Sequence, residues 1–377
     1  MRTIYYVDPQ SYNNLALYDY NLLSNINDYS IIFWGNSKYP KENNCNHNIS
    51  YKLLFKYSAK NKIFKYFSYM FSLIVLGYNI IRDKPHIVHV QWIKVWHLDV
   101  QLQVLCKLVG SKYIITAHNV VPHKYNNKYL FRYWLHYKMC TAIIVHDNNT
   151  KHIMVNNYKI EDVNVSVIPH GYLRYKYNEE RVDILIKEYE TLYKNNKIMI
   201  AMLGAQSKYK GTDIFVDTIA GYDNDDNIIW IIWGKNINIE YTKIIKKTNV
   251  IIKDEYISDE EFVAIMRCSD VIVLPYRTIS QSGILMTAIA ERTPVIVSKN
   301  GGLSDPIKYG NIGWVLTENT VRELDSTLNK VISNKEFVAI KNNILEWDKV
   351  EKQYSWENIA LNTATLYDKV LNELVCL

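Results

Sequence analysis

Short apolar runs recur along the whole chain, and longer stretches of mixed polarity separate them. The runs are rich in isoleucine, valine and aromatic residues, which favour strands. Continuous apolar runs of this length are typical of parallel strands that are buried on both faces and covered by crossover helices. Twelve runs have this character: Thr3–Val7, Ser30–Trp34, His86–Val90, Tyr113–Thr116, Ala142–Val145, Val165–Ile168, Ile198–Leu203, Ile228–Trp233, Val250–Ile252, Val271–Leu274, Val295–Val297 and Trp314–Leu316.

Twelve such strands are too many for one ordinary open sheet, so the sequence predicts an α/β fold with two doubly wound, Rossmann-like domains. The first domain is predicted to span residues 1–175 and the second residues 176–353. Glu179–Tyr193 is expected to form a charged connecting helix, and residues 354–377 a final amphipathic helix. Ligands of such domains bind beyond the carboxyl ends of the strands.

The composition is that of a folded globular protein, because 48% of the 377 residues are apolar and 22% are charged. The net charge of +6 is a mild basic excess and does not indicate a dedicated nucleic-acid binder. Five cysteines without a CxxC pair favour free thiols in a reducing compartment. The N-terminus resembles no signal peptide, and polar residues interrupt the apolar stretch Ile63–Ile81, so we expect a cytoplasmic protein without a spanning helix.

A turn with two lysines follows the predicted strand Ile198–Leu203 and precedes a helix. Free backbone N–H groups at a helix N-terminus and a nearby ammonium group suit a phosphate. Lys210 is therefore the first candidate ligand and Lys208 an alternative. An ordinary strand-to-helix turn with solvated lysines is the competing interpretation, and the local motif alone leaves it open.

A second turn follows the predicted strand Val271–Leu274 and opens a helix at Ile284. Gly283 permits close approach of the backbone, Ser282 adds a hydroxyl, and Arg277 is expected to reach the same anion. Two such helix N-termini on neighbouring strands would form a diphosphate site. The alternative is a helix that Ser282 merely caps.

Six segments resemble, in this order, motifs of the retaining glycosyltransferases with the GT-B fold known as family 4 or glycosyl transferases group 1. The segments are Thr116–His123 (TxHNxxPH), Val167–Gly171 (IPHG), Lys210–Gly211, Leu274–Gly283 (LPY(K/R)xxxQSG), Pro294–Leu303 (PVI…GGL) and Trp356–Asn358. The resemblance implies two domains that face each other across a cleft, and a last helix that returns to the first domain. It also implies transfer of a sugar from a nucleotide-diphosphate sugar to a hydroxyl of an acceptor glycan, with retention of configuration.

The resemblance also implies roles for individual residues. Lys210 would act on the leaving diphosphate, and His118 would contact the transferred sugar; without the family, a lone histidine is more often a structural hydrogen-bonding group. Residues expected to bind the donor are Gly204, Gln206, Lys208, Lys210, Glu255, Tyr256, Ile257, Arg277, Gln281, Ser282, Gly283 and Thr287. Residues expected to bind the acceptor are Asn13, Asn14, His118 and Asn119.

Three departures from the family pattern bear on activity. Two glutamates eight positions apart are replaced by Ile279 and Thr287, which we interpret as a trait of members with the QSG loop. The arginine that usually precedes the motif lysine is missing, so Arg277 or Lys208 would supply the second positive charge. The glycine-rich turn after the first strand is replaced by Asp8–Leu15, where Asn13 and Asn14 are small polar substitutes.

No metal or other cofactor is expected, because the candidate histidines lie on separate strands without ligand spacing; they are His118 and the weaker candidates His123, His146 and His170. Asp223–Asp226 is interpreted as a solvated turn. A non-catalytic nucleotide- or glycan-binding protein on the same fold remains the alternative function, since the glutamate pair is missing. An inverting epimerase-like enzyme or a phosphorylase on the same fold is a further alternative. A phosphorylase would need a cofactor lysine or a phosphate-selective acceptor pocket that the sequence does not show.

Lysines alternate with aromatic residues between Lys52 and Lys65, ahead of an apolar run. A basic-aromatic helix is typical of binding to an anionic membrane surface, whereas an amphipathic core helix with lysine stems over apolar surface is the alternative. Together with the resemblance, this segment suggests a polyprenyl-diphosphate-linked acceptor in the synthesis of a bacterial O-antigen or capsule. We therefore expect a peripheral protein on the cytoplasmic side of the membrane, with a nucleotide sugar as partner and no nucleic acid.

Overall fold

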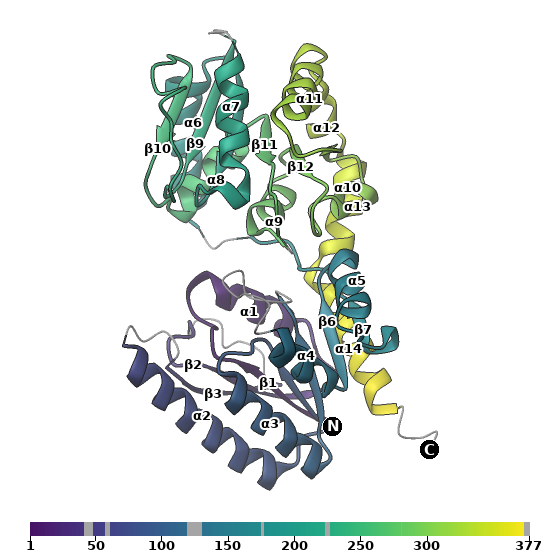
Figure 1. Cartoon of the computed structure of the whole chain (residues 1–377). Coiled ribbons are helices and arrows are strands. Elements are labelled where there is room, and N and C mark those ends of the chain that lie inside the picture. Colours follow the sequence, from purple (N-terminus) through teal and green to yellow (C-terminus); the bar gives the residue numbers. More distant parts are fainter. Residues whose placement is uncertain are drawn as a thin grey trace. The chain divides into compact units, whose positions relative to one another are not determined.

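The computed structural model describes residues 1–40, 48–56, 61–118, 130–174, 177–222, 227–279 and 281–372, without the side chains of Asn14 and Leu130. The chain divides into two compact units (Figure 1). The first unit comprises Met1–Gly171 and Trp356–Leu377, and the second comprises Tyr172–Ser355. The chain thus passes between the units after Gly171 and after Ser355, a few residues from the boundaries expected at 175 and 353.

The first unit is built on a sheet of seven parallel strands in the order β3-β2-β1-β4-β5-β6-β7. The strands are β1 (Thr3–Asp8), β2 (Ser30–Asn36), β3 (Ile49–Phe55), β4 (Ile87–Val90), β5 (Lys112–Thr116), β6 (Ala142–Val145) and β7 (Val165–Val167). The direction in which strands are added reverses between β1 and β4. This switch point is where a doubly wound sheet opens a crevice for ligands.

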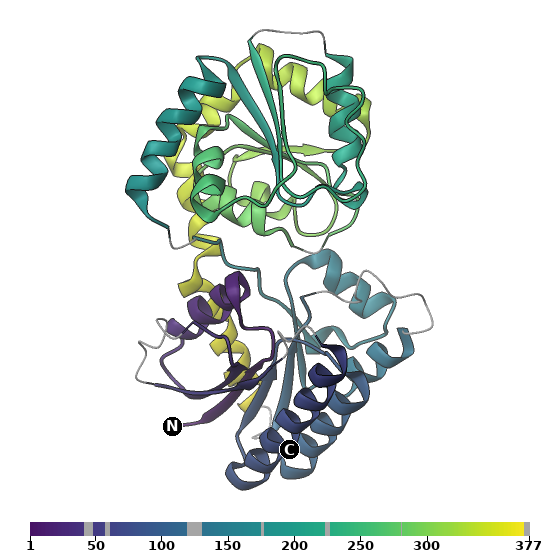
Figure 2. The ribbon, with the colours of Figure 1, turned by 90° about the vertical axis from the view of Figure 1, so that its left-hand side faces the viewer.

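Helices cover both faces of this sheet (Figures 1 and 2). Helices α2 and α3 pack against each other, and α3 also contacts α4, while α1 contacts the C-terminal helix α14. The described helices of the first unit are α1 (Ala16–Ser24), α2 (Lys62–Asp83), α3 (Trp96–Val109), α4 (Leu130–Lys138), α5 (Asn148–Asn156) and α14 (Trp356–Asn372), with short 3-10 turns at Asn13–Leu15 and Asp162–Asn164. Helix α14 therefore completes the first unit although it comes last in sequence.

The second unit has a sheet of six parallel strands in the order β10-β9-β8-β11-β12-β13. The strands are β8 (Ile198–Leu203), β9 (Ile228–Trp233), β10 (Val250–Lys253), β11 (Val271–Leu274), β12 (Val295–Ser298) and β13 (Gly313–Leu316). Its switch point lies between β8 and β11. The two turns singled out in the sequence follow these two strands, so they are neighbours at the carboxyl edge of the sheet.

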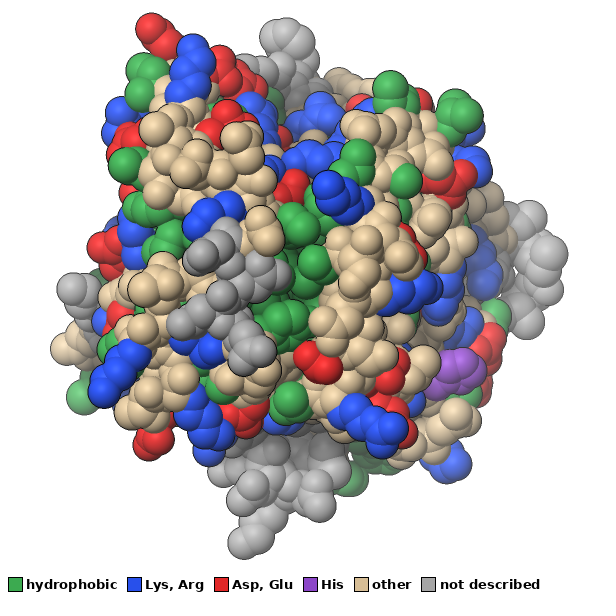
Figure 3. All heavy atoms as spheres, turned by 90° about the horizontal axis from the view of Figure 1, so that it is seen from above, with side chains coloured by type: hydrophobic (Ala, Val, Ile, Leu, Met, Phe, Trp, Pro, Cys, Tyr) green, Lys and Arg blue, Asp and Glu red, His purple; other side chains and the backbone are tan. Residues whose placement is uncertain are grey.

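Helices α6 and α8 of the second unit pack together, and α7 packs against α11. Helix α8 begins with a capping box in which Ser258 and Glu261 satisfy each other's backbone N–H groups. The helices are α6 (Glu179–Tyr189), α7 (Thr212–Gly221), α8 (Asp259–Cys268), α9 (Gly283–Ala290), α10 (Asp305–Tyr309), α11 (Val321–Ser333), α12 (Glu336–Lys341) and α13 (Ile344–Tyr354), with a π-helical turn at Glu190–Lys194 and a 3-10 turn at Lys208–Lys210. On the face seen in Figure 3, lysine and arginine side chains are mixed with acidic ones.

All twelve predicted strands are present, and the predicted α/β class with two doubly wound sheets is confirmed. The helix expected between Lys52 and Lys65 is wrong: Lys52 lies on β3, and helix α2 begins at Lys62. Strand β3 is an edge strand with exposed and half-exposed positions, and it carries a lysine. Edge strands are often blunted by such charged residues, so they lack the continuous apolar run that marks a central strand.

Helix α2 departs from the prediction in a second way. Among the described residues, Lys62–Asp83 forms a single helix that is long and apolar enough to cross a membrane by length and composition alone. A third of its apolar window is buried, and Tyr69, Leu73, Leu76 and Ile80 join the core of the first unit. Helix α2 therefore packs one apolar face on the protein and exposes another.

Candidate functional site

The two turns at the switch point of the second unit are pressed against each other. Gly211 adopts a left-handed conformation (φ +70°), and a Cβ there would fall 2.0 Å from the carbonyl oxygen of Pro275. The backbone N–H of Arg277 donates to the carbonyl of Tyr209 at 2.8 Å. Only glycine at position 211 permits this approach, so the turn after β8 and the turn after β11 form one surface.

The turn after β8 is held in shape from inside by Gln206. Its Nε2 donates to the carbonyl of Gly204 at 2.6 Å, and its Oε1 accepts a hydrogen bond from Thr212 at 3.0 Å. Gln206 is fully buried. The expectation that Gln206 binds the donor directly is therefore replaced by a structural role beneath the turn.

Lys210 lies on top of this turn. Its Nζ is 3.5 Å from the place that a Cβ on Gly204 would take, and 5.5 Å from the ring centroid of Tyr276. Burial lowers the pKa of Lys210 to about 8. Within the described parts of the chain, no carboxylate forms an ion pair with it. A half-buried cation without a counter-ion is the arrangement that an anionic ligand would complete.

Arg277 is engaged elsewhere. Its guanidinium group binds the carboxylate of Asp213 through two hydrogen bonds of 2.6 and 2.9 Å, and it also donates to the carbonyl of Lys208. The prediction that Arg277 supplies a second free charge is thus not met in this structure. The bidentate pair instead fastens the β11 turn to the start of α7.

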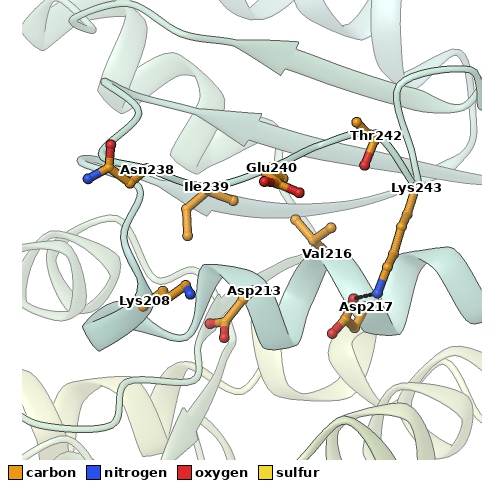
Figure 4. A pocket seen from close by; sticks show the side chains of 9 residues that line it. All are labelled: Lys208, Asp213, Val216, Asp217, Asn238, Ile239, Glu240, Thr242 and Lys243. Atoms are coloured by element: carbon orange, nitrogen blue, oxygen red, sulfur yellow. Dashed lines mark hydrogen bonds and ion pairs between the residues drawn. The ribbon is translucent and has the colours of Figure 1, made fainter.

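Lys208 faces a different hollow from Lys210. Figure 4 shows it at one end of a cavity between α7 and the segment after β9, where Lys243 pairs with Asp217 at 2.7 Å. Lys210 is not among the lining residues, which are Lys208, Asp213, Val216, Asp217, Asn238, Ile239, Glu240, Thr242 and Lys243. The two lysines of the motif therefore do not line the same cavity.

The start of α9 completes the switch point. Ser282 is its N-cap, since its side chain accepts a hydrogen bond from the N–H of Leu285 at 3.4 Å. The capping interpretation of Ser282 is thus what the structure shows, and Gly283 opens the helix beside the half-buried Gln281. Thr287 is buried within α9, and its hydroxyl donates to the carbonyl of Gly283 at 2.9 Å. This placement does not fit the expected donor contact of Thr287.

The proposed base-binding residues follow β10, on the same carboxyl edge. Glu255 and Tyr256 are exposed, and 86% of the Tyr256 surface is accessible. Ile257 is half-buried and packs against the core of the second unit. The order β10-β9-β8 places this loop two strands away from the Lys210 turn.

Residues after β1 and β4 meet at the switch point of the first unit; the sequence analysis singled out the turn Asp8–Leu15 but missed Trp92 and Lys94 after β4. The Asp8 carboxylate accepts a hydrogen bond from the N–H of Gln10 at 2.6 Å, and Lys94 donates to the Gln10 side chain. The Lys94 ammonium lies 4.2 Å from the ring centroid of Trp92. Burial raises the pKa of Asp8 to about 6 and lowers that of Lys94 to about 8. The reversal of strand order would have pointed to these positions.

His118 lies next to this group and is tightly held. Its Nε2 is 2.9 Å from Oε1 of Gln91, its Nδ1 is 3.0 Å from Nε2 of His146, and its ring stacks on Trp92 at 4.4 Å. Burial, reinforced by neighbouring histidines and Lys94, lowers the pKa of His118 well below its usual value. His118 is therefore anchored at the carboxyl edge of β5, in surroundings that disfavour its protonated form.

The remaining acceptor candidates are only partly described. Asn13 is exposed and adopts a left-handed conformation (φ 51°) in the turn before α1. The side chain of Asn14 and the whole of Asn119 and His123 lie outside the described residues, as does Asp223–Asp226. Across the described residues, no group of three or more histidine, cysteine, aspartate or glutamate side chains is placed to hold a metal ion.

Two family models match this chain, one in each unit. The model "Glycosyltransferase Family 4" matches residues 35–172, and "Glycosyl transferases group 1" matches residues 186–344. Mannosylfructose-phosphate synthase of Agrobacterium fabrum is 21% identical over 62% of this chain and 54% of its own length. Protein CapJ of Staphylococcus aureus is 26% identical over 47% of this chain and 46% of its own length. The chain thus spans about half the length of these curated relatives.

Solved structures share the fold over nearly the whole chain. A sucrose-phosphate synthase of Thermosynechococcus elongatus matches with a TM-score of 0.71 and 14% identity, over 99% of this chain and 100% of that one. A Rickettsia africae glycosyltransferase matches with a TM-score of 0.70 and 17% identity over 98% of both chains. Anabaena Alr3699/HepE in complex with UDP-glucose matches with a TM-score of 0.65 and 12% identity over 100% of both.

Proposed function

Because this chain belongs to the group 1 and family 4 glycosyltransferases of the GT-B fold, we propose that it transfers a sugar from a nucleotide-diphosphate sugar to a hydroxyl group of an acceptor glycan. The observation that carries the proposal is Lys210. Its ammonium group lies over two abutting turns at a switch point, is half-buried, and pairs with no described carboxylate. An anionic diphosphate would neutralise this charge.

In the proposed reaction, the bond between the anomeric carbon and the diphosphate oxygen breaks, and the acceptor oxygen forms the new bond to that carbon on the same face. Because the new bond forms on the face that the diphosphate leaves, configuration is retained, and the acceptor proton passes to the departing diphosphate. Lys210 and the backbone N–H groups at the start of α9 stabilise the charge that develops on the leaving group. No divalent cation is assigned to this step.

The base of the nucleotide is proposed to bind at Glu255–Ile257. This loop follows β10 on the same edge as the Lys210 turn, and the ring of Tyr256 offers an exposed apolar face. Anabaena Alr3699/HepE was solved with UDP and with UDP-glucose, which makes a uridine nucleotide the first donor to test.

The test combines binding and turnover. Thermal unfolding of the purified chain is measured with UDP, GDP, ADP, CMP and dTDP, since a ligand that binds the folded state raises the melting temperature. Donor hydrolysis and sugar transfer are then measured with the matching nucleotide sugar. A stabilising nucleotide with neither hydrolysis nor transfer would favour a non-catalytic binding protein. The absence of any stabilising nucleotide would contradict the proposal.

The acceptor is proposed to be a polyprenyl-diphosphate-linked glycan in bacterial surface polysaccharide synthesis, used at the cytoplasmic face of an anionic membrane. Support comes from the outer face of α2, where Phe67, Phe71, Ile74, Tyr78 and Ile81 are each more than half exposed. No charged residue occurs between Lys65 and Arg82. Five exposed apolar side chains in succession are unusual for a helix in water.

The charges at the ends of α2 support a membrane surface as the partner of this apolar face. Lys62 and Lys65 lie at its start, Arg82 and Lys84 at its end, and Asp83 is paired with Arg82. A second copy of the chain packed on this face would bring cations against cations in either direction. An anionic lipid surface complements both the apolar stripe and the cationic ends.

A further inference from the structure

A mostly buried series of hydrogen bonds crosses the carboxyl edge of the first unit. From the main-chain carbonyl of Ile168 it runs to Nδ1 of His146 (2.9 Å), and from Nε2 of His146 to Nδ1 of His118 (3.0 Å). It continues from Nε2 of His118 to the Gln91 amide (2.9 Å) and from that amide to Nε2 of His89 (3.1 Å). Four successive strands, β7 to β4, each contribute a member at or just beyond their ends.

This series of hydrogen bonds ends at Tyr367 on α14, the last described helix of the protein. Nδ1 of His89 is 2.6 Å from the hydroxyl of Tyr367 on α14, and its Nε2 is also 2.8 Å from the hydroxyl of Thr116. Both His89 and Tyr367 are fully buried. The tautomer of His89 is therefore decided by protein groups and not by solvent.

Counting hydrogens limits the possible states. The Ile168 carbonyl can only accept, so Nδ1 of His146 must carry a hydrogen. If Oε1 of Gln91 faces His118, the three contacts of the His118–His146 pair need three hydrogens, whereas two neutral imidazoles supply two. The pair must then hold an extra proton, or the Gln91 amide must turn so that its NH₂ group faces His118.

The surroundings favour the neutral pair. Burial lowers the pKa of His146 to about 3. Burial, together with the facing groups His146, His170, Lys94 and His89, lowers the pKa of His118 well below its usual value. Tyr18 packs edge-on against both rings and brings no opposite charge at neutral pH. An extra proton on the His118–His146 pair would be buried near the Lys94 ammonium group, which costs free energy.

We propose that His146 is a positioning residue that fixes His118 as the neutral tautomer protonated at Nδ1, with Gln91 turned so that its N–H donates to Nε2. The Gln91 carbonyl then accepts from Nε2–H of His89, whose Nδ1 accepts from the Tyr367 hydroxyl. His118 consequently offers a lone pair at Nε2, and a sugar hydroxyl that displaced Gln91 would meet an acceptor. This consequence for transfer rests on the proposed function; the tautomer does not.

The direct test is nitrogen NMR of the full chain labelled with ¹⁵N-histidine at neutral pH, which reports whether each ring nitrogen carries a hydrogen. The His118 signals are identified by their loss in His118→Gln. We expect Nδ1 of His118 to be protonated and Nε2 not. Protonation at Nε2, or at both nitrogens, in the wild type would overturn the proposal.

Variants of His146 and Gln91 test which groups donate and which accept along this series of hydrogen bonds. His146→Phe removes the acceptor and should release the Nδ1–H tautomer of His118, whereas His146→Gln supplies an amide oxygen and should keep it. Gln91→Glu offers only acceptor oxygens to His118, so it should move a hydrogen to Nε2 and raise the pKa of His118. An unchanged His118 tautomer in both His146→Phe and Gln91→Glu would contradict the assignment.

His136→Phe is the matched control. His136 is a buried histidine of the same unit, and its ring nitrogens have no hydrogen-bond partner among the described residues. It should leave the His118 signals unchanged. With a nucleotide sugar that is turned over, His146→Phe should lower kcat at least tenfold at unchanged donor KM, with recovery in His146→Gln. If no sugar is transferred by the wild type, the proposed function fails while the NMR result still decides the tautomer.

Discussion

At the scale of single residues, Lys210 distinguishes the turn after β8 from an ordinary strand-to-helix turn with solvated lysines. Lys208 is exposed and faces the cavity beside α7, Arg277 is neutralised by Asp213, and Lys210 stays half-buried without a described acidic partner. The sequence analysis made Lys210 the first candidate, with Lys208 as an alternative and Arg277 as a second cation from the neighbouring turn. The structure separates them by what each cation already touches.

Lys210→Ala should abolish most transfer while the protein stays folded. Loss of one charge-assisted contact that strengthens in the transition state costs about 2–4 kcal/mol, or roughly a thirty- to thousandfold fall in kcat/KM. Steady-state kinetics and thermal unfolding check this, with Lys208→Ala as the control that should retain activity. Wild-type turnover by Lys210→Ala would remove the lysine from the site.

The pKa of Lys210 predicts how nucleotide binding depends on pH. Because burial lowers this pKa to about 8, the lysine loses its proton as the pH rises through 8, and affinity for a nucleoside diphosphate should fall. Lys210→Arg keeps its charge and should bind with little change between pH 7 and 9.5. Calorimetric titrations of both proteins over this range measure the effect. Parallel pH profiles would contradict the assignment.

The lowered pKa of Lys210 also predicts how the free energy of unfolding changes with pH. The pKa of Lys210 drops from 10.5 to about 8 on folding, so between these values the unfolded chain binds more protons than the folded one. The contribution of this residue to the free energy of unfolding therefore rises with pH across that window. Denaturant unfolding at pH 8 and pH 10 should show this rise in wild type and not in Lys210→Met.

Chelation tests how the leaving group is stabilised. If Lys210 and the N–H groups at the start of α9 balance the charge of the diphosphate, transfer should persist in excess EDTA. Activity is compared with EDTA alone and after addition of Mg²⁺ or Mn²⁺. Loss of transfer with recovery on adding a divalent cation would refute the proposed charge balance.

At the scale of elements, the sequence predicted what depends on local pattern. The central strands were found because burial on both faces makes them continuous apolar runs, and the Lys210 turn was found because its residues are contiguous. Edge strand β3 escaped, since its outer positions are polar or half-exposed. The His118–Gln91–His146 arrangement also escaped, because it depends on which strands are neighbours and not on spacing along the chain.

Helix α2 supports a prediction about membranes. Replacing Phe71 and Tyr78 by glutamate places two charges in the middle of the exposed apolar stripe, which should abolish binding to anionic vesicles. Sedimentation with vesicles at low and high salt measures binding. The matched control is Val163→Glu with Leu361→Glu, two exposed apolar residues of the same unit away from α2, and it should bind like wild type.

Two outcomes would contradict lipid binding by α2. Equal sedimentation of the Phe71/Tyr78 variant and wild type would place the membrane contact elsewhere. A wild type that stays in solution but elutes as a dimer, and becomes monomeric in the variant, would show that the stripe joins two copies of the chain.

At the scale of the whole molecule, two short segments link the units, and each unit holds them close together. In the first unit, a Cβ on Gly171 would fall 2.5 Å from the indole of Trp356. In the second, the N–H of Tyr172 donates to the carbonyl of Tyr354 at 3.0 Å. The residues on both sides of the two crossings are therefore in contact within their own unit.

The crossing also reaches the histidine cluster. Tyr18 packs edge-on against Trp356 at 5.2 Å and against His118 at the same centroid distance. His170, the residue before Gly171, lies 4.9 Å from Tyr18. Tyr18 thus contacts both Trp356 at the crossing and His118 in the histidine cluster.

This contact predicts a coupling between the two crossings. Gly171 has an ordinary backbone conformation, so Gly171→Ala acts through the clash with the Trp356 indole and should cost about 1–3 kcal/mol of unfolding free energy. In a Trp356→Leu background the smaller side chain leaves room, and the same substitution should cost at least about 0.5 kcal/mol less. Denaturant unfolding of the four proteins gives the coupling energy. Additive effects would mean that Trp356 is not what requires glycine at position 171.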